Sequence, residues 1–352
     1  MALLTYRNIG ITGIAAAVPE NKIINAEFTE FFTPKEVKSV SRMTGIKERR
    51  VASDDMCASD LCYAAAEKLF TEMNINREEI DILIFISQTP DYRMPATGII
   101  LQSRLGLPKT TGAFDINLGC SGYSYGLALA YGYAAQENIR KVLLLNGETR
   151  TKVYSFKDKS TGLLFGDGGC ASIIEKISDE NPSFFSLNSD GARSDLIKIK
   201  AGGYRYPSSL ESLEKKTYED SSIRNDEQGV MDGAGIFDFT IQEIPEDIKR
   251  IFEFSGESQD NIDFYLMHQA NKFITDHIAK KMKIPKDRVP YSIQKFGNTS
   301  SVSIPLTIVS ELRNELSSTT KRVFMTGFGV GLSWACAITS ISNCVIPELV
   351  EI

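Results

Sequence analysis

The feature that most constrains the fold is an internal repeat within the 352 residues. The segment "REEIDILIFISQTP" (77–90) is similar to "QDNIDFYLMHQAN" (259–271), and in each an Ile-Asp pair leads into an apolar run that is typical of a buried strand. A predicted helix then precedes "LGLPK" in the first copy and "MKIPK" in the second. Two further pairs follow in the same order, "GAFDINLGCSG" with "VPYSIQKFGNTS" and "KVLLLNGE" with "KRVFMTGFG". The pair "GAFDINLGCSG" and "VPYSIQKFGNTS" predicts, in each copy, a short strand that runs into a turn and a new helix.

This repeat predicts a duplicated α/β protein. Because the four pairs keep their order at a nearly constant offset, we infer two related halves that meet near residue 180. Strand-like runs alternate with helical patterns, which is typical of α/β layers around buried sheets. We expect an N-terminal half, residues 1–180, and a C-terminal half, residues 181–352. Turns at equivalent ends of the two related sheets can meet, so the expected site lies between the halves.

Charge and cysteine content argue against several classes of function. The formal net charge is −6 with no basic cluster, so we do not expect a nucleic-acid surface. No run of about 18 apolar residues predicts a membrane span, and Arg7 and Asn8 interrupt the apolar core that a signal peptide needs. We therefore expect a cytoplasmic protein. Six cysteines without a C-x-x-C motif, and only two histidines, predict neither a disulfide framework nor a metal site.

Cys120 is the first candidate for chemistry. It lies in "FDINLGCSGYSYGLALA" (114–130), between a predicted strand and a predicted helix. A thiol at a helix N-terminus lies at the positive end of the helix dipole, which favours the thiolate. Gly119 and Gly122 allow a sharp turn and the close approach of a substrate. Considered alone, Cys120 is better explained as a small buried residue at a tight corner.

Two residues of the second half are candidates for the same site. His268 ends a predicted strand, where α/β proteins gather functional groups, although a purely structural histidine would fit as well. Asn298, in "KFGNTSSVSIP", occupies the turn equivalent to that of Cys120 and can donate a side-chain N–H to an oxyanion. A turn or helix cap is its simpler explanation. His277 is expected on the surface.

Two glycine-rich segments also predict tight turns. "GFGVGLSW" (327–334) reads as a turn between strands at which the backbone closely approaches a ligand, and the match to a nucleotide-binding motif is weak. "FGDGGCASII" (165–174) predicts a tight turn entering a strand, and we assign it no chemistry.

Taken together, six segments resemble the ketoacyl-acyl-carrier-protein synthase III family of thiolase-fold condensing enzymes. They are "SRMTGIKERR", "FDINLGCSGYSYGLA", "LLFGDGGCASII", "LMHQANKFI", "KFGNTSSVSIP" and "GFGVGLSWACAI", and they span nearly the whole chain. The resemblance implies a five-layered αβαβα fold, a homodimer and a catalytic triad of Cys120, His268 and Asn298.

The resemblance also implies how the site works. Cys120 accepts an acyl group from a thioester, while His268 and Asn298 hold the thioester carbonyl of a malonyl unit that loses CO₂. The backbone N–H groups of Cys120 and Val330 form a second oxyanion hole. The family assigns substrate contacts to Asn271, Met94, Phe328 and Gly329. It implies no permanently bound cofactor, since coenzyme A or the phosphopantetheine of acyl carrier protein carries the substrates.

Several residues depart from the family pattern. The family commonly has a Trp before "R-T-G-I" that stacks on the adenine of coenzyme A, whereas the only Trp here is Trp334. Phe273 stands at a position that is usually basic, and Val330 replaces a Gly and narrows the expected substrate path. A polar insertion, 204–230, is expected near the substrate entrance. These departures put acetyl-coenzyme A as donor and a housekeeping role in doubt, and a donor carried on acyl carrier protein is compatible with them. Met94 corresponds to a position that reaches the partner subunit's acyl pocket, where a flexible side chain tolerates varied acyl shapes.

Three functions stay open at this point. The first is a decarboxylating condensation that gives 3-oxoacyl-acyl carrier protein, in fatty-acid initiation or a specialised pathway. The second is a non-decarboxylating transfer of the acyl group from Cys120 to a hydroxyl or amine. The third is an inactive homologue that binds acyl chains or a carrier protein. The acyl chain, the donor carrier and the pathway are not determined by the sequence.

Overall fold

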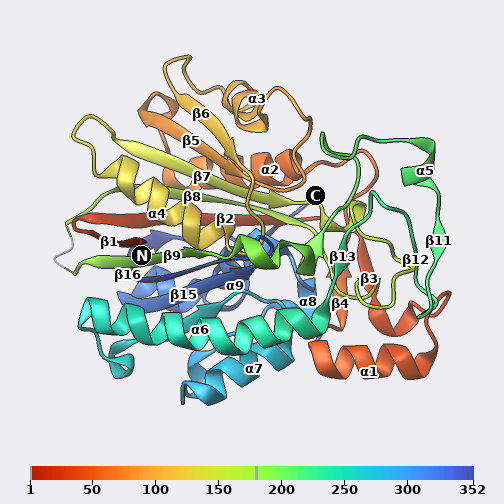
Figure 1. Cartoon of the computed structure of the whole chain (residues 1–352). Helices are drawn as coiled ribbons and strands as arrows, with labels where there is room; N and C mark the ends of the chain where they lie inside the picture. The colour runs from red at the N-terminus through yellow and green to blue at the C-terminus, as the bar shows by residue number, and fades with distance from the viewer. Residues whose placement is uncertain (1, 179–180) are drawn as a thin grey trace.

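The computed structural model describes residues 2–178 and 181–352. The expected boundary near residue 180 lies outside the described residues. Within them, two half-sheets have matching strand pairings and are joined into one 11-stranded sheet (Figure 1).

The first half-sheet has five strands. In spatial order they are β2 (Ile9–Val18), β8 (Gly168–Lys176), β7 (Lys141–Glu148), β5 (Ile80–Ile86) and β6 (Gly112–Ile116). β2 and β8, and β8 and β7, pair antiparallel, whereas β7, β5 and β6 run parallel. The parallel strands read as nearly continuous apolar runs because helices cover both of their faces.

The second half-sheet repeats this pattern. Its order is β9 (Ser183–Ser189), β16 (Ser333–Val345), β15 (Lys321–Gly329) and β14 (Phe264–Met267), with β1 (Ala2–Tyr6) added beside β9. As in the first half, the first two contacts are antiparallel and β15 and β14 are parallel. Parallel pairing of β16 with β2 joins the halves, and β17 (Val350–Glu351) also pairs with β2.

One predicted strand is wrong. Residues 289–292, the counterpart of β6, form no strand and lead directly into α8 (Ile293–Phe296). Pro290 lacks the backbone N–H that a ladder needs, which accounts for the difference between the copies.

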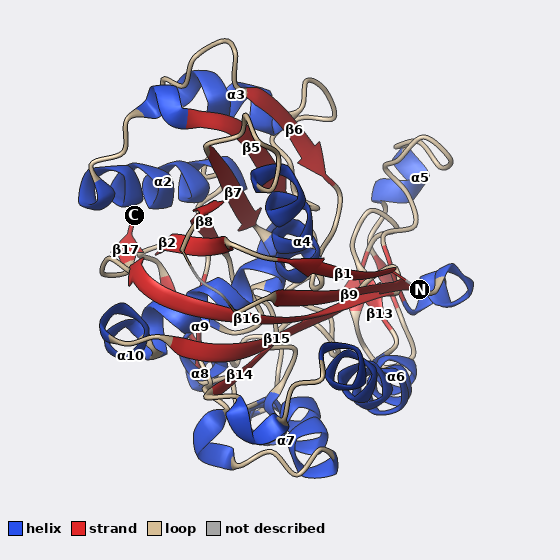
Figure 2. Cartoon of the chain, turned by 90° about the vertical axis from the view of Figure 1, so that its left-hand side faces the viewer, coloured by secondary structure: helices blue, strands red, loops and turns tan. Residues whose placement is uncertain are grey.

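Helices complete the five layers that the family resemblance implied. α4 (Gly122–Ala134) and α9 (Ser303–Glu311) lie between the half-sheets, α2 (Ala58–Met73) and α3 (Thr97–Arg104) cover the first, and α6 (Gly233–Ser255) and α7 (Lys272–Lys281) cover the second (Figure 2). α4 is apolar on nearly all sides, as expected of a helix packed between two sheets, although Leu129 and Tyr133 are exposed. The mixed α/β, thiolase-like fold is thus confirmed.

The remaining elements are short or peripheral. α1 (Pro34–Thr44) begins at a capping box formed by Thr33 and Glu36, and α10 (Arg313–Ser318) follows α9. The other short elements are β3 (Lys22–Ile24), β4 (Glu48–Arg50), β10 (Ile197–Lys198), α5 (Leu210–Leu213), β11 (Lys216–Thr217), β12 (Ile223–Arg224) and β13 (Val230–Met231). In the part of the chain that the structure describes, no helix has the length and apolar character needed to cross a membrane.

Candidate active site

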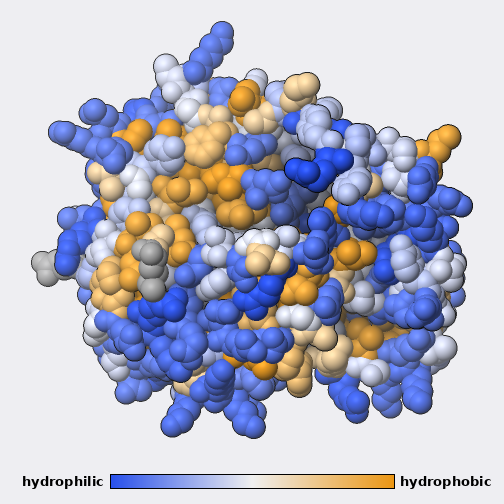
Figure 3. Space-filling model, viewed as in Figure 1, coloured by the Kyte–Doolittle hydropathy of each residue, from blue (hydrophilic) through white to orange (hydrophobic). Residues whose placement is uncertain are grey.

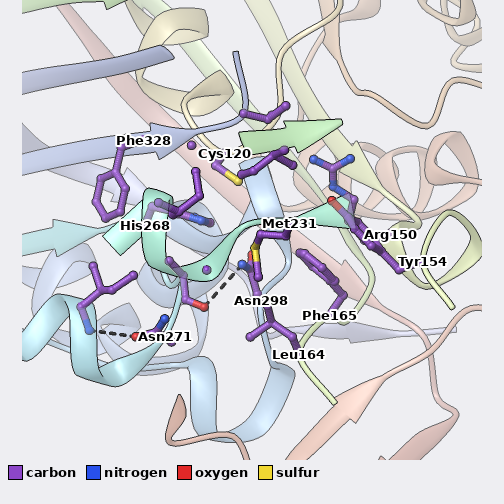
Figure 4. Close-up of a pocket in the computed structure, with 17 residues that line it drawn as sticks. Cys120, Arg150, Tyr154, Leu164, Phe165, Met231, His268, Asn271, Asn298 and Phe328 are labelled. Carbon is purple, nitrogen blue, oxygen red and sulfur yellow. Dashed lines mark hydrogen bonds between the residues drawn. The ribbon is translucent and has the colours of Figure 1, made fainter. Parts of the chain in front are cut away.

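A cavity of about 60 Å³ lies where the two halves meet (Figure 4). Cys120 and Arg150 line it from the first half, and His268 and Asn298 line it from the second. Four other predicted site residues also line this cavity: Asn271, Phe328, Gly329 and Val330. The structure therefore brings together residues that are up to about half a chain apart in sequence.

Cys120 is held just before the N-terminus of α4. Its Sγ lies 3.7 Å from the Ser300 hydroxyl oxygen, and the residue is buried. Burial raises the pKa of the Cys120 thiol, but the charge and hydrogen bond of His268 and the charge of Arg150 outweigh burial and lower the pKa to about 6. A thiol with this pKa is largely ionised at neutral pH and can act as a nucleophile.

Gly329, at the end of β15, allows another strand to approach Cys120 closely. A Cβ atom at Gly329 would lie 2.8 Å from Cys120 Cβ and 2.9 Å from its Sγ. Both distances are shorter than nonbonded atoms allow. Within the segment 327–334, residues 330–332 form the predicted turn, which connects β15 with β16. The close approach seen here is to Cys120, whereas the sequence predicted an approach to a ligand.

His268 follows β14, and its imidazole is fixed from one side. Its Nδ1 lies 2.8 Å from the Ser303 hydroxyl oxygen, which also accepts a 3.3 Å hydrogen bond from the Gln269 N–H. The Phe328 ring packs edge-on against the imidazole, with 5.5 Å between ring centroids. Ser303 thus occupies Nδ1, so the other ring nitrogen, Nε2, is the one available to a ligand.

Asn298 is held by the backbone of the first half. Its N–H donates to the Leu164 carbonyl at 3.0 Å, and its carbonyl accepts from Gly166 N–H at 3.2 Å. Its side-chain Oδ1 accepts from Ser300 N–H at 2.9 Å, and Nδ2 has only a 3.5 Å contact with the Ala270 carbonyl. Because Oδ1 is engaged, Nδ2 is the group that can donate to a ligand oxygen.

Some predicted residues lie elsewhere. Met94 does not line this cavity and is 78% exposed. His277 is half-buried rather than on the open surface, since its ring packs against Phe237 with 5.7 Å between centroids. Asn271 lines the cavity, but its Oδ1 also accepts from Ile274 N–H at 2.8 Å and caps α7.

A second cavity of about 400 Å³ adjoins the first and shares Leu164, Met231 and Asn271 with it. Met43 of α1 and Phe273 of α7 also line this outer cavity. The described part of 204–230 lines neither cavity, so the expected position at the entrance holds only for flanking residues such as Met231 and Gly233. Trp334 is buried against Phe239 and lies away from this opening.

Sequence reasoning missed four polar residues of the site. Glu148 is the last residue of β7, and Arg150, which lines the cavity and pairs with Glu148, follows two residues later. Charged residues at the end of a buried strand were the signal that could have found them. Ser300 and Ser303 contact Cys120 and His268, respectively. Their only sequence signal is their proximity to Asn298. Among residues 2–178 and 181–352, no group of three or more His, Cys, Asp or Glu side chains could hold a metal ion.

Comparison with known proteins identifies the family of the chain. Residues 114–191 match the 3-oxoacyl-[acyl-carrier-protein (ACP)] synthase III family, and residues 252–341 match its C-terminal domain. A Campylobacter jejuni relative is 35% identical over 95% of this chain and 94% of its own length. The beta-ketoacyl-[acyl-carrier-protein] synthase III of Desulfitobacterium hafniense strain Y51 is 31% identical over 96% of this chain and 98% of its own.

A solved structure extends this agreement to the fold. The 3-oxoacyl-(acyl-carrier protein) synthase from Burkholderia xenovorans LB400 superposes with a TM-score of 0.94 and 37% identity. The match covers 100% of this chain and 99% of that one. The chain therefore belongs to the beta-ketoacyl-[acyl-carrier-protein] synthase III family of thiolase-fold condensing enzymes, and it is an acyltransferase.

Proposed function

We propose that this protein catalyses a decarboxylating condensation between an acyl group on Cys120 and a malonyl thioester on acyl carrier protein. The observation that carries the proposal is the meeting of Cys120, His268 and Asn298 in one cavity. Cys120 supplies the nucleophile, and His268 and Asn298 supply two hydrogen-bond donors for a developing enolate.

In the first step, the Cys120 thiolate attacks the carbonyl carbon of an acyl thioester. A new carbon–sulfur bond forms, the bond to the carrier sulfur breaks, and the carrier leaves as a thiol after protonation. The backbone N–H groups of Cys120 and Val330 stabilise the oxyanion of the tetrahedral intermediate. Preorganised donors of this kind stabilise charge that appears only in the transition state.

In the second step, the malonyl thioester carbonyl accepts hydrogen bonds from His268 Nε2 and Asn298 Nδ2. Cleavage of the carbon–carbon bond releases CO₂ and leaves an enolate whose charge these donors stabilise. Its α-carbon attacks the acyl-Cys120 carbonyl, and the Cys120 thiolate is released. The product is a 3-oxoacyl thioester on acyl carrier protein. Ser303, by occupying Nδ1, orients His268 for this donation.

A second candidate is transfer of the acyl group to a hydroxyl or amine. It needs Cys120 but not the loss of CO₂, so it leaves the paired donors of His268 and Asn298 without a developing enolate to stabilise. A homologue that only binds acyl groups is less well supported because Cys120, His268 and Asn298 are all present and line one cavity.

The carriers and partners follow from the same proposal. The outer cavity between α1 and α7 receives the pantetheine arm of acyl carrier protein or coenzyme A. No resident cofactor takes part. The enzyme works as a homodimer in which Met94 extends toward the partner's acyl pocket. The reaction serves fatty-acid initiation or a specialised pathway.

Release of CO₂ from malonyl-acyl carrier protein tests the proposal. Asn298→Ala removes one enolate donor, so we expect decarboxylation to fall about 100-fold or more, whereas acylation of Cys120 persists. CO₂ trapping and intact-protein mass spectrometry measure the two steps separately. Acyl transfer to an alcohol or amine without CO₂ release would favour the second candidate.

A further inference from the structure

Arg150 lines the cavity opposite the imidazole of His268, and Glu148 is its buried ionic partner. Arg150 and Glu148 follow one another closely at the end of β7, and Arg150 is 4% exposed while Glu148 is fully buried. The condensation steps proposed above use neither residue directly. Buried charges are costly unless their hydrogen-bonding groups find partners, so this pair calls for a functional explanation.

Both carboxylate oxygens of Glu148 accept hydrogen bonds, whereas one N–H of Arg150 has no acceptor. The Glu148 carboxylate accepts hydrogen bonds from Thr89 Oγ1 at 3.0 Å, from Gln88 N–H at 3.3 Å and from Ser300 Oγ at 3.5 Å. Arg150 Nη2 donates to Gln88 Oε1 at 2.8 Å. Its Nε is buried without a hydrogen-bond partner and lies 3.8 Å from Glu148 Oε2, which is beyond hydrogen-bond length.

The guanidinium lies directly beside the nucleophile. A Cβ atom added to Gly119 would be 2.8 Å from Arg150 Nη2, so the guanidinium packs against the residue that precedes Cys120. In Figure 4, Arg150 and Tyr154 lie on one side of the cavity, and His268 and Phe328 lie on the other. Since the proposed malonyl donors are on the His268 side, the Arg150 side is left for the acyl group on Cys120.

The part of the cavity left for the acyl group is small, and Arg150 makes one of its walls polar. A single water needs roughly 10–15 Å³ of such space, so a cavity of about 60 Å³ holds only a few non-hydrogen atoms. Leu164, Phe165 and Met231 supply apolar walls, and Arg150 supplies a charged donor. A plain alkyl chain in contact with Arg150 would leave the buried Nε–H without a hydrogen-bond acceptor.

We propose that Cys120 carries a short acyl group bearing an oxygen acceptor, namely a carboxylate, hydroxyl or carbonyl, and that Arg150 binds this oxygen. The inference rests on the proposed acyl-Cys120 intermediate and adds the class of the acyl group. A site built to hydrogen-bond a substrate oxygen rejects the analogue that lacks it, because its own polar groups are then left unpaired. Arg150 is therefore a specificity-determining residue.

The test compares matched four-carbon donors on the same carrier. Butyryl, 3-hydroxybutyryl and succinyl thioesters of pantetheine are each mixed with the full-length protein, and the rate of mass gain at Cys120 is measured. We expect the faster of the two oxygenated donors, 3-hydroxybutyryl or succinyl, to acylate wild type at least about tenfold faster than butyryl does. Arg150→Leu should reduce this ratio to about one, and Arg150→Lys should retain part of it. Comparison of the hydroxyl and carboxylate donors identifies the acceptor.

Two control variants make the outcome decisive. The double variant Arg150→Leu with Glu148→Gln removes both buried charges, so it replaces the single variant if that one does not fold. Arg140→Leu removes an exposed arginine and should leave the ratio unchanged. If Arg150→Leu lowers the acylation rate equally for all donors, Arg150 only supports the thiolate and the inference is overturned. The inference is also overturned if wild type condenses but is acylated fastest by butyryl. If no donor acylates wild type, the proposed function fails and the inference fails with it.

Discussion

At the scale of single residues, opposing influences act on the sulfur of Cys120. Burial disfavours the thiolate, whereas His268 and Arg150 favour it and set the pKa at about 6. The other buried cysteines behave differently, since burial raises the pKa of Cys62, Cys170, Cys336 and Cys344. The lowered pKa therefore reflects the particular neighbours of Cys120 rather than its residue type.

This difference predicts the pH dependence of alkylation. The thiolate is the reactive form, so alkylation of Cys120 by iodoacetamide should be slow below pH 6 and rise through a midpoint near pH 6. In His268→Ala the largest opposing influence is lost while burial remains, so the midpoint should move to higher pH. Peptide mass spectrometry of Cys120 measures both profiles. A wild-type midpoint at the ordinary cysteine value of about 8.5 would contradict the account.

Sequence reasoning identified the three central residues because each ends a strand or turn that recurs in the repeat. It did not identify Arg150, Ser300 or Ser303. Their importance depends on which atoms meet when the halves pack, such as the 2.8 Å contact between Ser303 Oγ and His268 Nδ1. No sequence period or motif contains that information.

At the scale of elements, the site depends on the approach of β15 to the start of α4. Gly329 permits this approach because a side chain there would overlap Cys120. Sequence patterns located β5, β6, β7, β14 and β15 by their apolar runs and their place in the repeat, but they did not predict β2 and β9. They could not locate β10 to β13, since ladders of two residues have no detectable period, and Pro290 removed a strand that the repeat predicted.

The close approach predicts the effect of adding one methyl group. In Gly329→Ala the new Cβ would lie within 3 Å of Cys120 Cβ and Sγ, so the nucleophile must shift. A small misplacement of reacting atoms can cost about 100-fold in rate, and we expect at least that loss of Cys120 acylation. Gly191→Ala is the matched control, because a Cβ there meets no atom within 4 Å. Equal acylation rates in the two variants would contradict the proposed geometry.

At the scale of the whole molecule, the duplication places one cavity between two half-sheets that have the same pairing pattern. The ordered repeat in the sequence predicted two related halves, and the matching pairing pattern of the half-sheets accords with it, although β1 pairs in the second half-sheet and β17 in the first. The parallel contact of β16 with β2, which joins the halves into one sheet, was not predicted because nothing local in either strand specifies its partner.

One edge of the molecule also predicts its assembly. β6 ends the sheet with one side unpaired among the described strands, and apolar residues gather over α4 and this edge (Figure 3). Ile99 and Tyr133 there are 51% and 38% exposed. Exposed strand edges with apolar neighbours commonly pair with another chain.

We therefore expect a homodimer through this edge. Light scattering should give twice the chain mass for wild type and a single chain mass for the double variant Ile99→Asp with Tyr133→Asp. Leu213→Asp, an exposed leucine on α5, should remain dimeric. A wild type that is monomeric at micromolar concentration would exclude the dimer and the proposed role of Met94 in the partner's pocket.

The most direct test of the account is the intact mass of the protein after exposure to a panel of acyl thioesters. Coenzyme A and acyl carrier protein should each be included as carriers, with Cys120→Ala as the control. We predict a mass gain of one acyl group, mapped to Cys120, which subsequent malonyl-acyl carrier protein removes with release of CO₂. No mass gain with any donor, or a gain that persists in Cys120→Ala, would contradict the account.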